Sequence, residues 1–174
     1  MTRTSEADEA EFRSFAVDRW PRLLRTAFLL TGNHHDAEDL VQTVLAKSYV
    51  QWRRVAQASD RDAYVWRVMI NAHRDRVRGL RVFEWLTTRF PERADRDRTE
   101  DILARDVLAG ALQRLPVKQR AAVVLRYVED RTETEVAALL GIRLGTVRSR
   151  SARGLEKLRA DPAVGALRHA GSRR

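Results

Sequence analysis

Residues 132–158, with the sequence TETEVAALLGIRLGTVRSRSARGLEKL, constrain the fold more than any other stretch of the chain. Thr132 and Glu135 have the T-x-x-E spacing of a capping box, which predicts that a helix begins here. Gly141 predicts the end of that helix, because glycine adopts the left-handed conformation that terminates helices. Only a short turn over residues 142–144 separates it from a second, basic helix. A helix, a glycine-containing turn and a basic helix together predict a helix-turn-helix motif.

The second helix of this motif has two distinct faces. Residues three or four apart share a face, and one face forms a stripe that can pack on a core: Val147, Ser151, Leu155 and Leu158. The opposite face is small, polar and cationic, and it carries Thr146, Arg148, Ser149, Ala152 and Arg153. A solvated basic face would give the same pattern. In a helix-turn-helix, however, the second helix usually enters the major groove, where arginines read base edges and small side chains permit close approach, so a DNA-reading face is favoured.

Apolar residues recur at helical spacing along most of the remaining chain, and no stretch alternates as a strand would. We expect helices over residues 9–30, with Pro21 as a joint between two of them, and over 36–55, with Asp36 as the N-cap. A further helix is expected over 61–78, capped by Ser59, and two more over 102–115 and 119–127. The chain is therefore expected to be all-α.

Charge divides the chain into two parts. The formal net charge is +9, but residues 61–90 carry seven basic and three acidic side chains, and residues 105–174 carry fifteen and seven. The stretch ERADRDRTED, which follows Pro91, is acidic and polar and typical of a linker. We expect two small helical domains, over residues 1–90 and 102–174, joined by a flexible acidic linker over 91–101. Two basic regions indicate that different parts of the chain meet anionic partners.

Composition excludes several classes of protein. The chain has no cysteine, so it has neither disulfides nor a thiolate metal site. No apolar run approaches the ~20 residues that span a bilayer, and the acidic N-terminus is unlike a signal peptide, so we expect a soluble intracellular protein without membrane insertion. His34 and His35 are adjacent and point apart on a helix, which disfavours metal binding. No nucleophile–base constellation or phosphate-binding glycine loop is present, so we expect no metal, no cofactor and no enzymatic activity.

The segment 61–78 interleaves aromatic and basic side chains. Tyr64 and Trp66 lie beside Arg67, with Arg74 and Arg78 further along. Aromatic faces stack bases and arginines hold phosphates, so this pattern predicts a surface for single-stranded nucleic acid. The alternative is that Tyr64 and Trp66 complete the apolar core, since neighbouring apolar residues on a helix often bury together.

Both halves of the chain resemble the extracytoplasmic-function sigma factors of bacterial RNA polymerase, group IV of the sigma-70 family, and most closely their actinobacterial SigE-like subset. The resemblance lies in LLRTAFLLTGNHHDAEDLVQTVLAKSYVQW, DAYVWRVMINAHRDRVRG and LQRLPVKQRAAVVLRYVEDRTETEVAALLGIRLGTVRSRSARGLEKLR, which occur in this order over residues 10–160. It implies a factor that binds core polymerase, recognises the −35 and −10 promoter elements and promotes DNA melting. The alternative is a stand-alone helix-turn-helix repressor or activator, which would have no use for the AEDLVQ face of the first domain.

The resemblance implies a polymerase-binding face. AEDLVQ, residues 37–42, resembles the region that binds the coiled coil at the clamp of the polymerase β′ subunit, and this places Glu38, Asp39 and Gln42 at the contact. A carboxylate and an amide suit the arginine-rich tip of such a coiled coil. A solvated helix face with acids near its N-terminus would give the same pattern.

The resemblance also implies two contacts with promoter DNA. Residues 61–78 resemble the region that melts the −10 element and reads it as a single strand with a flipped base. Asn71 would read a base edge there, and the strand would be held by Tyr64, Trp66, Arg67, Arg74, Arg76 and Arg78. The helix-turn-helix resembles the region that reads the −35 duplex, through Thr146, Arg148, Ser149, Ala152 and Arg153, with Arg143 on phosphate. This second domain would also contact the β flap, an anti-sigma factor would cover the same surfaces, and the expected place of action is the cytoplasm, at the nucleoid.

Overall fold

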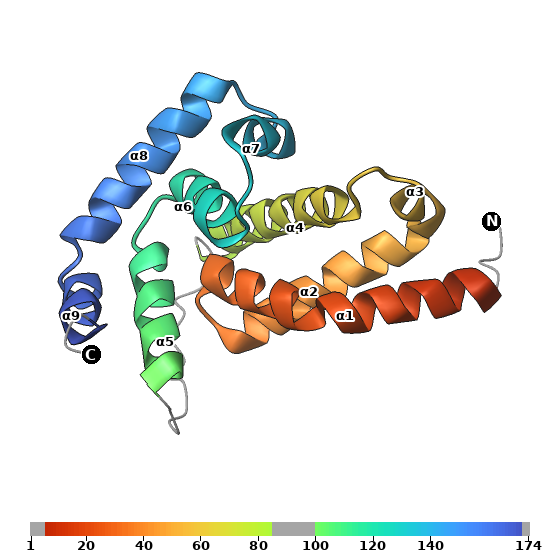
Figure 1. The fold of residues 1–174 in the computed structure, drawn as a ribbon, viewed down its shortest axis with the longest axis horizontal. Coiled ribbons are helices and arrows are strands. Elements are labelled where there is room, and N and C mark those ends of the chain that lie inside the picture. The colour runs from red at the N-terminus through yellow and green to blue at the C-terminus, as the bar shows by residue number, and fades with distance from the viewer. Residues whose placement is uncertain (1–5, 85–99, 172–174) are drawn as a thin grey trace.

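The computed structural model describes residues 6–84 and 100–171, and every regular element in those ranges is a helix, which confirms the all-α prediction. Figure 1 shows α1, α2 and α4 side by side in one half of the molecule and α5 to α9 in the other. The elements are α1 Glu6–Thr31, α2 His34–Val50, α3 Trp52–Ala56, α4 Arg61–Glu84, α5 Glu100–Gln113, α6 Val117–Val123, the π-helical turn η1 Val124–Val128, α7 Glu133–Leu140, α8 Leu144–Ala160 and α9 Pro162–Gly171.

The first helix, α1, runs without a break through Pro21, so the predicted joint at this residue is wrong. Buried side chains lie on both sides of the proline, including Phe15 before it and Leu23 after it. The rings of Phe12 and Phe15 each lie 5.2 Å from the ring of Trp52, centroid to centroid. Burial of several large side chains, at roughly 1.5–3 kcal/mol each, exceeds the ~3 kcal/mol that an interior proline costs. Packing therefore holds the helix continuous.

Three helix ends differ from the prediction. The N-cap of α2 is Asn33 rather than Asp36, because Asn33 Oδ1 accepts a hydrogen bond from the Asp36 amide at 3.0 Å. At the start of α4, Asp60 rather than Ser59 accepts from the amide three residues later, at 2.8 Å. Both follow the rule that a capping side chain bonds an amide of the first turn. The helix expected over 36–55 is interrupted at Gln51, where α2 gives way to α3.

The helix-turn-helix prediction is confirmed in α7 and α8. Thr132 and Glu135 form the expected capping box: the Glu135 carboxylate accepts from the Thr132 amide at 2.7 Å, and Thr132 Oγ1 accepts from the Glu135 amide at 3.2 Å. Gly141 follows α7 with a φ of 63°, in the left-handed region that favours glycine. Where α8 packs on α6, a Cβ on Gly154 would lie 2.5 Å from Val123 Cγ2, so only glycine permits this approach.

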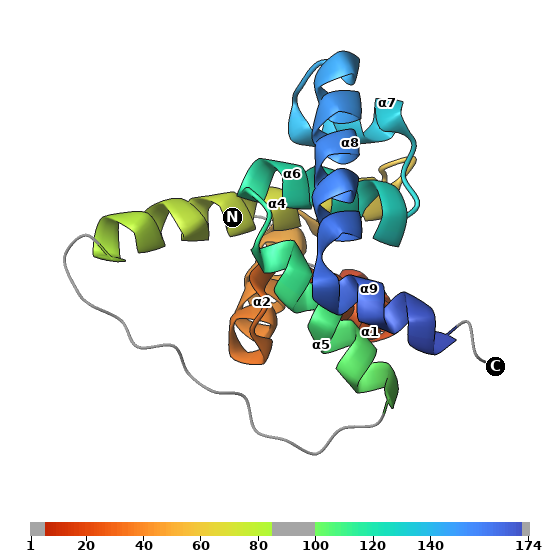
Figure 2. The same ribbon diagram turned by 90° about the vertical axis from the view of Figure 1, so that its left-hand side faces the viewer.

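The two halves of the molecule are docked against each other. Both α5 and η1 lie on α1, and α7 lies on α4; the turned view shows α5 against the first half (Figure 2). Residues 91–99 of the predicted linker lie outside the described residues, and the last two linker positions, 100 and 101, belong to α5. The division into domains over 1–90 and 102–174 stays a prediction.

A buried ion pair joins the two halves at the middle of α1. The side chain of Glu129, which follows η1, is 0% exposed. Its carboxylate accepts hydrogen bonds from Arg22 Nε at 2.7 Å and from Thr26 Oγ1, both on α1. Arg22 also donates to Asp62 of α4 at 3.2 Å. A buried carboxylate without a cation costs several kcal/mol, so the docked arrangement requires Arg22 as long as Glu129 is present.

A second set of contacts closes the C-terminal end of α1. The guanidinium of Arg120, buried in α6, donates to the Leu30 carbonyl at 2.6 Å, and the Gln113 amide of α5 donates to the carbonyls of Leu29 and Leu30 at 3.2 Å. The last carbonyls of a helix lack partners within it and carry the negative end of its dipole. Gly32 follows with a φ of 74°, and a Cβ there would overlap Gln113 Cγ. Side chains of the second half thus cap the last turn of α1.

Candidate nucleic-acid interface

The exposed face of α2 carries the three residues predicted to bind polymerase. Glu38 and Gln42 are exposed. The side chain of Asp39 is 43% exposed, and it pairs with His35 Nε2 at 3.6 Å and with Arg76 Nη1 at 3.7 Å. The opposite face of α2 packs against α1 and α4. The three polar side chains are therefore presented together by a helix that is fixed from behind.

Arg76 of α4 belongs to this acidic face of α2. Its guanidinium pairs with Asp36 as well as with Asp39, both on α2, although it shares α4 with the arginines predicted for DNA. Nothing in the sequence pattern of α4 separates Arg76 from those arginines. Only the packing of α4 on α2 assigns it to the carboxylates.

The surface of α4 brings together most of the residues predicted for single-stranded DNA. Arg67, Arg74 and Arg78 are exposed, and Tyr64 and Asn71 are half-buried. Asn71 Oδ1 accepts a hydrogen bond from Arg74 Nη2 at 2.8 Å, which orients the amide. Tyr64 packs against the apolar core and is only partly covered by it. The surface is thus cationic, with an oriented amide at its centre.

Trp66 is not part of this surface, so the structure corrects its predicted contact with DNA. The side chain is 2% exposed and lies in the core with Val65 and Met69. The Arg22 guanidinium covers its ring, 5.4 Å from the ring centroid. The helix α4 is covered on more than one side, by α1 and α2 and by α7 of the second half. Neighbouring positions on α4 are therefore buried together, which is the alternative that the sequence left open for Trp66.

The helix α8 runs along the outer edge of the molecule (Figure 1), and most of the residues predicted for duplex DNA are exposed on it. Arg148 Nε donates to Glu133 Oε2 at 2.7 Å, and Ser149 Oγ donates to the Thr146 carbonyl at 3.2 Å. The face opposite is buried at Val147, Ser151, Gly154 and Leu158. Thr146 is half-buried, and the exposed members of the predicted set are Arg143, Arg148, Ser149, Ala152 and Arg153.

Three residues that the sequence analysis assigned to no functional surface lie beside two of the arginines that were predicted to contact DNA. His73, Lys118 and Arg150 line the same cavity as Arg74 and Arg78. Their residue types were visible in the sequence, but they come from three different helices. Their convergence depends on how the two halves dock, and no sequence spacing reports that.

Within residues 6–84 and 100–171, no helix combines the length and the apolar character needed to cross a bilayer. The same part of the chain holds no cluster of three or more histidine and acidic side chains arranged to bind a metal ion.

The chain matches two known families in the order of its two halves. Residues 16–82 match Sigma-70 region 2, and residues 105–158 match Sigma-70, region 4. The chain is 39% identical over 151 residues to the RNA polymerase sigma-E factor of Streptomyces coelicolor, with 87% of this chain and 85% of that protein covered. It is 28% identical over 173 residues to the ECF RNA polymerase sigma factor SigW of Bacillus subtilis, with 91% and 92% covered.

The fold is similar to solved structures. The sigma factor RpoE of Bartonella quintana, in complex with the anti-sigma factor NepR, superposes with a TM-score of 0.72 at 26% identity, over 86% of this chain and 95% of that one. CnrH, in complex with the cytosolic domain of CnrY, superposes with a TM-score of 0.59 at 22% identity, over 93% and 90%, which is a likeness of fold.

Proposed function

Because this chain belongs to the extracytoplasmic-function sigma factors of the sigma-70 family, we propose that three of its surfaces divide the work of transcription initiation. The first half binds core RNA polymerase through α2 and melts and reads the −10 element through α4. The second half reads the −35 element through α8. The observation that carries the proposal is the outer surface of α8, where four residues stand exposed opposite a buried stripe: Arg148, Ser149, Ala152 and Arg153.

The polymerase contact uses the exposed face of α2. Glu38 and Asp39 offer carboxylates and Gln42 offers an amide, which together suit the arginine-rich tip of the β′ clamp coiled coil. Arg76 already pairs with Asp39 at 3.7 Å. A guanidinium of the polymerase would therefore bind Asp39 beside Arg76 or in its place.

The −10 contact uses the surface of α4. Arg67, Arg74 and Arg78 hold the backbone of the melted strand, and the Asn71 amide, which both donates and accepts, reads a base edge. Tyr64 is half-buried, whereas Trp66 is buried, so we assign stacking of a base to Tyr64. Flipping a base costs a few kcal/mol, which stacking and contacts to the base edge offset. Trp66 supports the surface from beneath.

The −35 contact uses α8 as a recognition helix in the major groove. Arg148 and Arg153 reach base edges or phosphates, and Ser149 and Ala152 leave room for the groove wall. Thr146 and Arg143 lie at the start of the helix, where backbone amides favour a phosphate. The second half also contacts the β flap in this proposal.

The docked arrangement is too small to span both promoter elements. The −35 and −10 elements are about 25 base pairs apart, which at about 3.4 Å per base pair is on the order of 85 Å. A compact chain of 174 residues has a radius of gyration of about 16 Å. We infer that the two halves separate on the promoter, which breaks the pair between Arg22 and Glu129.

The polymerase performs the chemistry in this proposal, and the chain directs it, in the cytoplasm at the nucleoid, without enzymatic activity or a cofactor of its own. The similar structure of Bartonella quintana RpoE is a complex with the anti-sigma factor NepR. We therefore propose an anti-sigma factor as a further partner, which would cover the surfaces of α2 and α4.

The test is transcription in vitro from a genomic fragment library with purified core polymerase, with and without the chain. We expect starts that share elements near −35 and −10. Asp39→Arg reverses the charge at the clamp contact and should abolish them. Arg148→Ala should reduce them by roughly 5- to 150-fold, the equivalent of the ~1–3 kcal/mol of one good base contact. Arg105→Ala removes the same charge from an exposed position of α5, outside the proposed surfaces, and should have no effect.

A stand-alone helix-turn-helix repressor or activator gives a different result. It would bind duplex DNA tightly without polymerase and would generate no transcripts that depend on the chain. That outcome, measured by electrophoretic mobility shift beside the transcription assay, would replace the proposal.

A further inference from the structure

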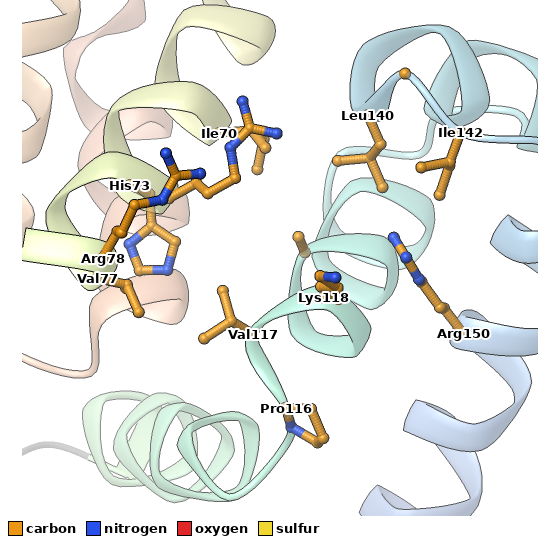
Figure 3. Close-up of a pocket in the computed structure, with 13 residues that line it drawn as sticks. Ile70, His73, Val77, Arg78, Pro116, Val117, Lys118, Leu140, Ile142 and Arg150 are labelled. Atoms are coloured by element: carbon orange, nitrogen blue, oxygen red, sulfur yellow. The ribbon is translucent and has the colours of Figure 1, made fainter. Parts of the chain in front are cut away.

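A cavity lies at the junction of the two halves, between α4 on one side and α6, α7 and α8 on the other (Figure 3). Its volume is about 570 Å³. Five apolar side chains supply much of its wall: Ile70, Val77, Val117, Leu140 and Ile142. Pockets of about 300–1,000 Å³ that are mostly apolar and carry a few polar groups are typical of sites for small organic ligands.

The charged groups around this cavity are all cations. Arg74 and Arg78 come from α4, Lys118 from α6 and Arg150 from α8, and none of the described residues that line it is an aspartate or glutamate. Arg74 is hydrogen-bonded to the neutral Asn71. Like charges gathered around an apolar space repel one another unless an anion lies among them. Guanidinium groups bind phosphate oxygens with two parallel hydrogen bonds, which makes phosphate a better match than a single acceptor.

His73 adds an unmet hydrogen-bonding group to the wall. Its side chain is 4% exposed, and neither ring nitrogen has a hydrogen-bond partner among the described residues. Burial, and then the nearby charges of Arg120 from α6 and Arg76 from α4, lower the pKa of His73 to about 4. The imidazole is therefore neutral at pH 7 and has one N–H to donate. Buried polar groups in folded proteins are normally satisfied, so an acceptor in the cavity would complete this one.

We propose that this cavity binds a small amphipathic organic phosphate. The apolar part of the ligand lies on the side chains of α4, α6 and α7 that form the wall. The phosphate lies among Arg78, Lys118 and Arg150, which line the cavity from three helices. The phosphate group is the shared chemistry of a soluble alkyl phosphate and of a phospholipid headgroup, and the experiment below separates the two sources.

Occupation of the cavity has a regulatory consequence, which rests on the proposed function. The ligand touches α4 of the first half and α6 to α8 of the second, so it binds the docked arrangement and not the separated one. Binding to one state alone stabilises that state. Arg74 and Arg78 also belong to the proposed −10 surface, so ligand and promoter compete for them. The organic phosphate therefore acts as an inhibitor of initiation.

Calorimetric titration of the full chain tests the site directly, with octyl phosphate below its micelle concentration as the probe. We expect one saturable site. Inorganic phosphate should bind at least tenfold more weakly, and octanol and octyltrimethylammonium should not bind. Lys118→Ala and Arg150→Ala, which are outside the proposed DNA and polymerase contacts, should each weaken octyl phosphate binding at least tenfold, whereas Arg105→Ala should leave it unchanged. Melting followed by circular dichroism checks that each variant is folded.

Vesicles separate the two sources of the phosphate. Phosphatidylcholine vesicles that contain phosphatidic acid should displace octyl phosphate if a lipid headgroup can enter, and should leave it bound if the ligand is a soluble phosphate. Three results would overturn the proposal. Octyltrimethylammonium could bind as tightly as octyl phosphate, octyl phosphate could show no saturable site, or its binding could be unchanged by both Lys118→Ala and Arg150→Ala. Saturable binding of an acidic amphipathic peptide in place of octyl phosphate would overturn it in favour of a protein partner. Calorimetry requires no polymerase, so failure here is distinct from failure of the proposed function.

The regulatory part has its own readout in the transcription assay. Octyl phosphate should inhibit transcription by the wild-type chain and should not inhibit the Lys118→Ala, Arg150→Ala double variant. Equal inhibition of both chains would overturn the assignment of the effect to this cavity.

Discussion

Removing Arg22 should open the molecule without unfolding either half. The Glu129 carboxylate is 0% exposed, and its hydrogen-bond partners, Arg22 and Thr26, both lie on α1, in the other half. Removing one partner of a buried ion pair typically costs 3–5 kcal/mol. Arg22 is itself 37% exposed, and water can reach the gap that it leaves, so we use the lower end, about 3 kcal/mol. At about 1.4 kcal/mol per tenfold, Arg22→Ala should shift the ratio of docked to separated molecules by about 150-fold.

Glu129→Ala should cost less, although it removes the same ion pair. It takes away the buried charge, and the Arg22 left behind still pairs with Asp62 at 3.2 Å. We expect about 1 kcal/mol, or roughly fivefold, the scale of an exposed ion pair. The Arg22→Ala, Glu129→Ala double variant should therefore contain fewer separated molecules than Arg22→Ala alone. Arg22→Ala has the largest effect because it alone leaves a buried carboxylate without a cation. If only the lost contact mattered, the two single variants would have equal effects.

Energy transfer between two dyes measures the separation. The chain has no cysteine, so Val50→Cys in the first half and Lys157→Cys in the second give two unique and exposed labelling sites. We expect the urea midpoint for loss of transfer to fall most for Arg22→Ala, while circular dichroism reports unfolding of the helices separately. Arg13→Ala, an exposed arginine of the same helix, is the matched control and should change nothing. Equal effects of Arg22→Ala and Glu129→Ala, or no change in either, would refute the reasoning.

Three further predictions concern single positions. Gly154→Ala places a Cβ 2.5 Å from Val123 Cγ2 and should lower the free energy of unfolding, measured in urea, by about 1–3 kcal/mol. The control is Gly145→Ala, whose Cβ meets no atom within 4 Å and which should be neutral or stabilising. Equal effects of the two substitutions would contradict this prediction. Thr132→Ala removes the capping hydroxyl of α7 and should cost about 1 kcal/mol in a thermal melt, an effect that Thr132→Ser should largely restore. Burial, and then two neighbouring guanidiniums, lower the pKa of His73 from 6.5 to about 4. As the pH falls, the unfolded chain therefore binds a proton on this histidine before the folded chain does. The free energy of unfolding should fall between pH 6.5 and 4, by up to about 3 kcal/mol. Urea titrations at several pH values should show a weaker pH dependence in His73→Leu, and an unchanged dependence would count against this assignment.

Local signals predicted the part of the site that one helix builds by itself. The capping box at Thr132, the end of α7 at Gly141 and the exposed face of α8 around Arg148 all depend on residues within a few positions of one another. Backbone hydrogen bonding and the helical period act over that range, so spacing alone reports them. The all-α class was predictable for the same reason.

Long-range packing decided what spacing could not. Pro21 lies inside a continuous helix because side chains on both sides of it are buried against other helices. The residues next to Trp66 in the sequence do not reveal whether its side chain is buried. It is buried because other helices cover α4 from several directions. Arg76, which the family resemblance placed on the DNA strand, pairs instead with two carboxylates of α2.

The sequence by itself determined the helices, the helix-turn-helix and the polar faces of α2, α4 and α8, because each follows from residues a few positions apart. Only the tertiary structure decided that the two halves dock through Arg22 and Glu129, and that cations from three helices surround one apolar cavity. Those residues are up to 107 positions apart. Burial and charge pairing act through space, and a helical period carries no information at that separation.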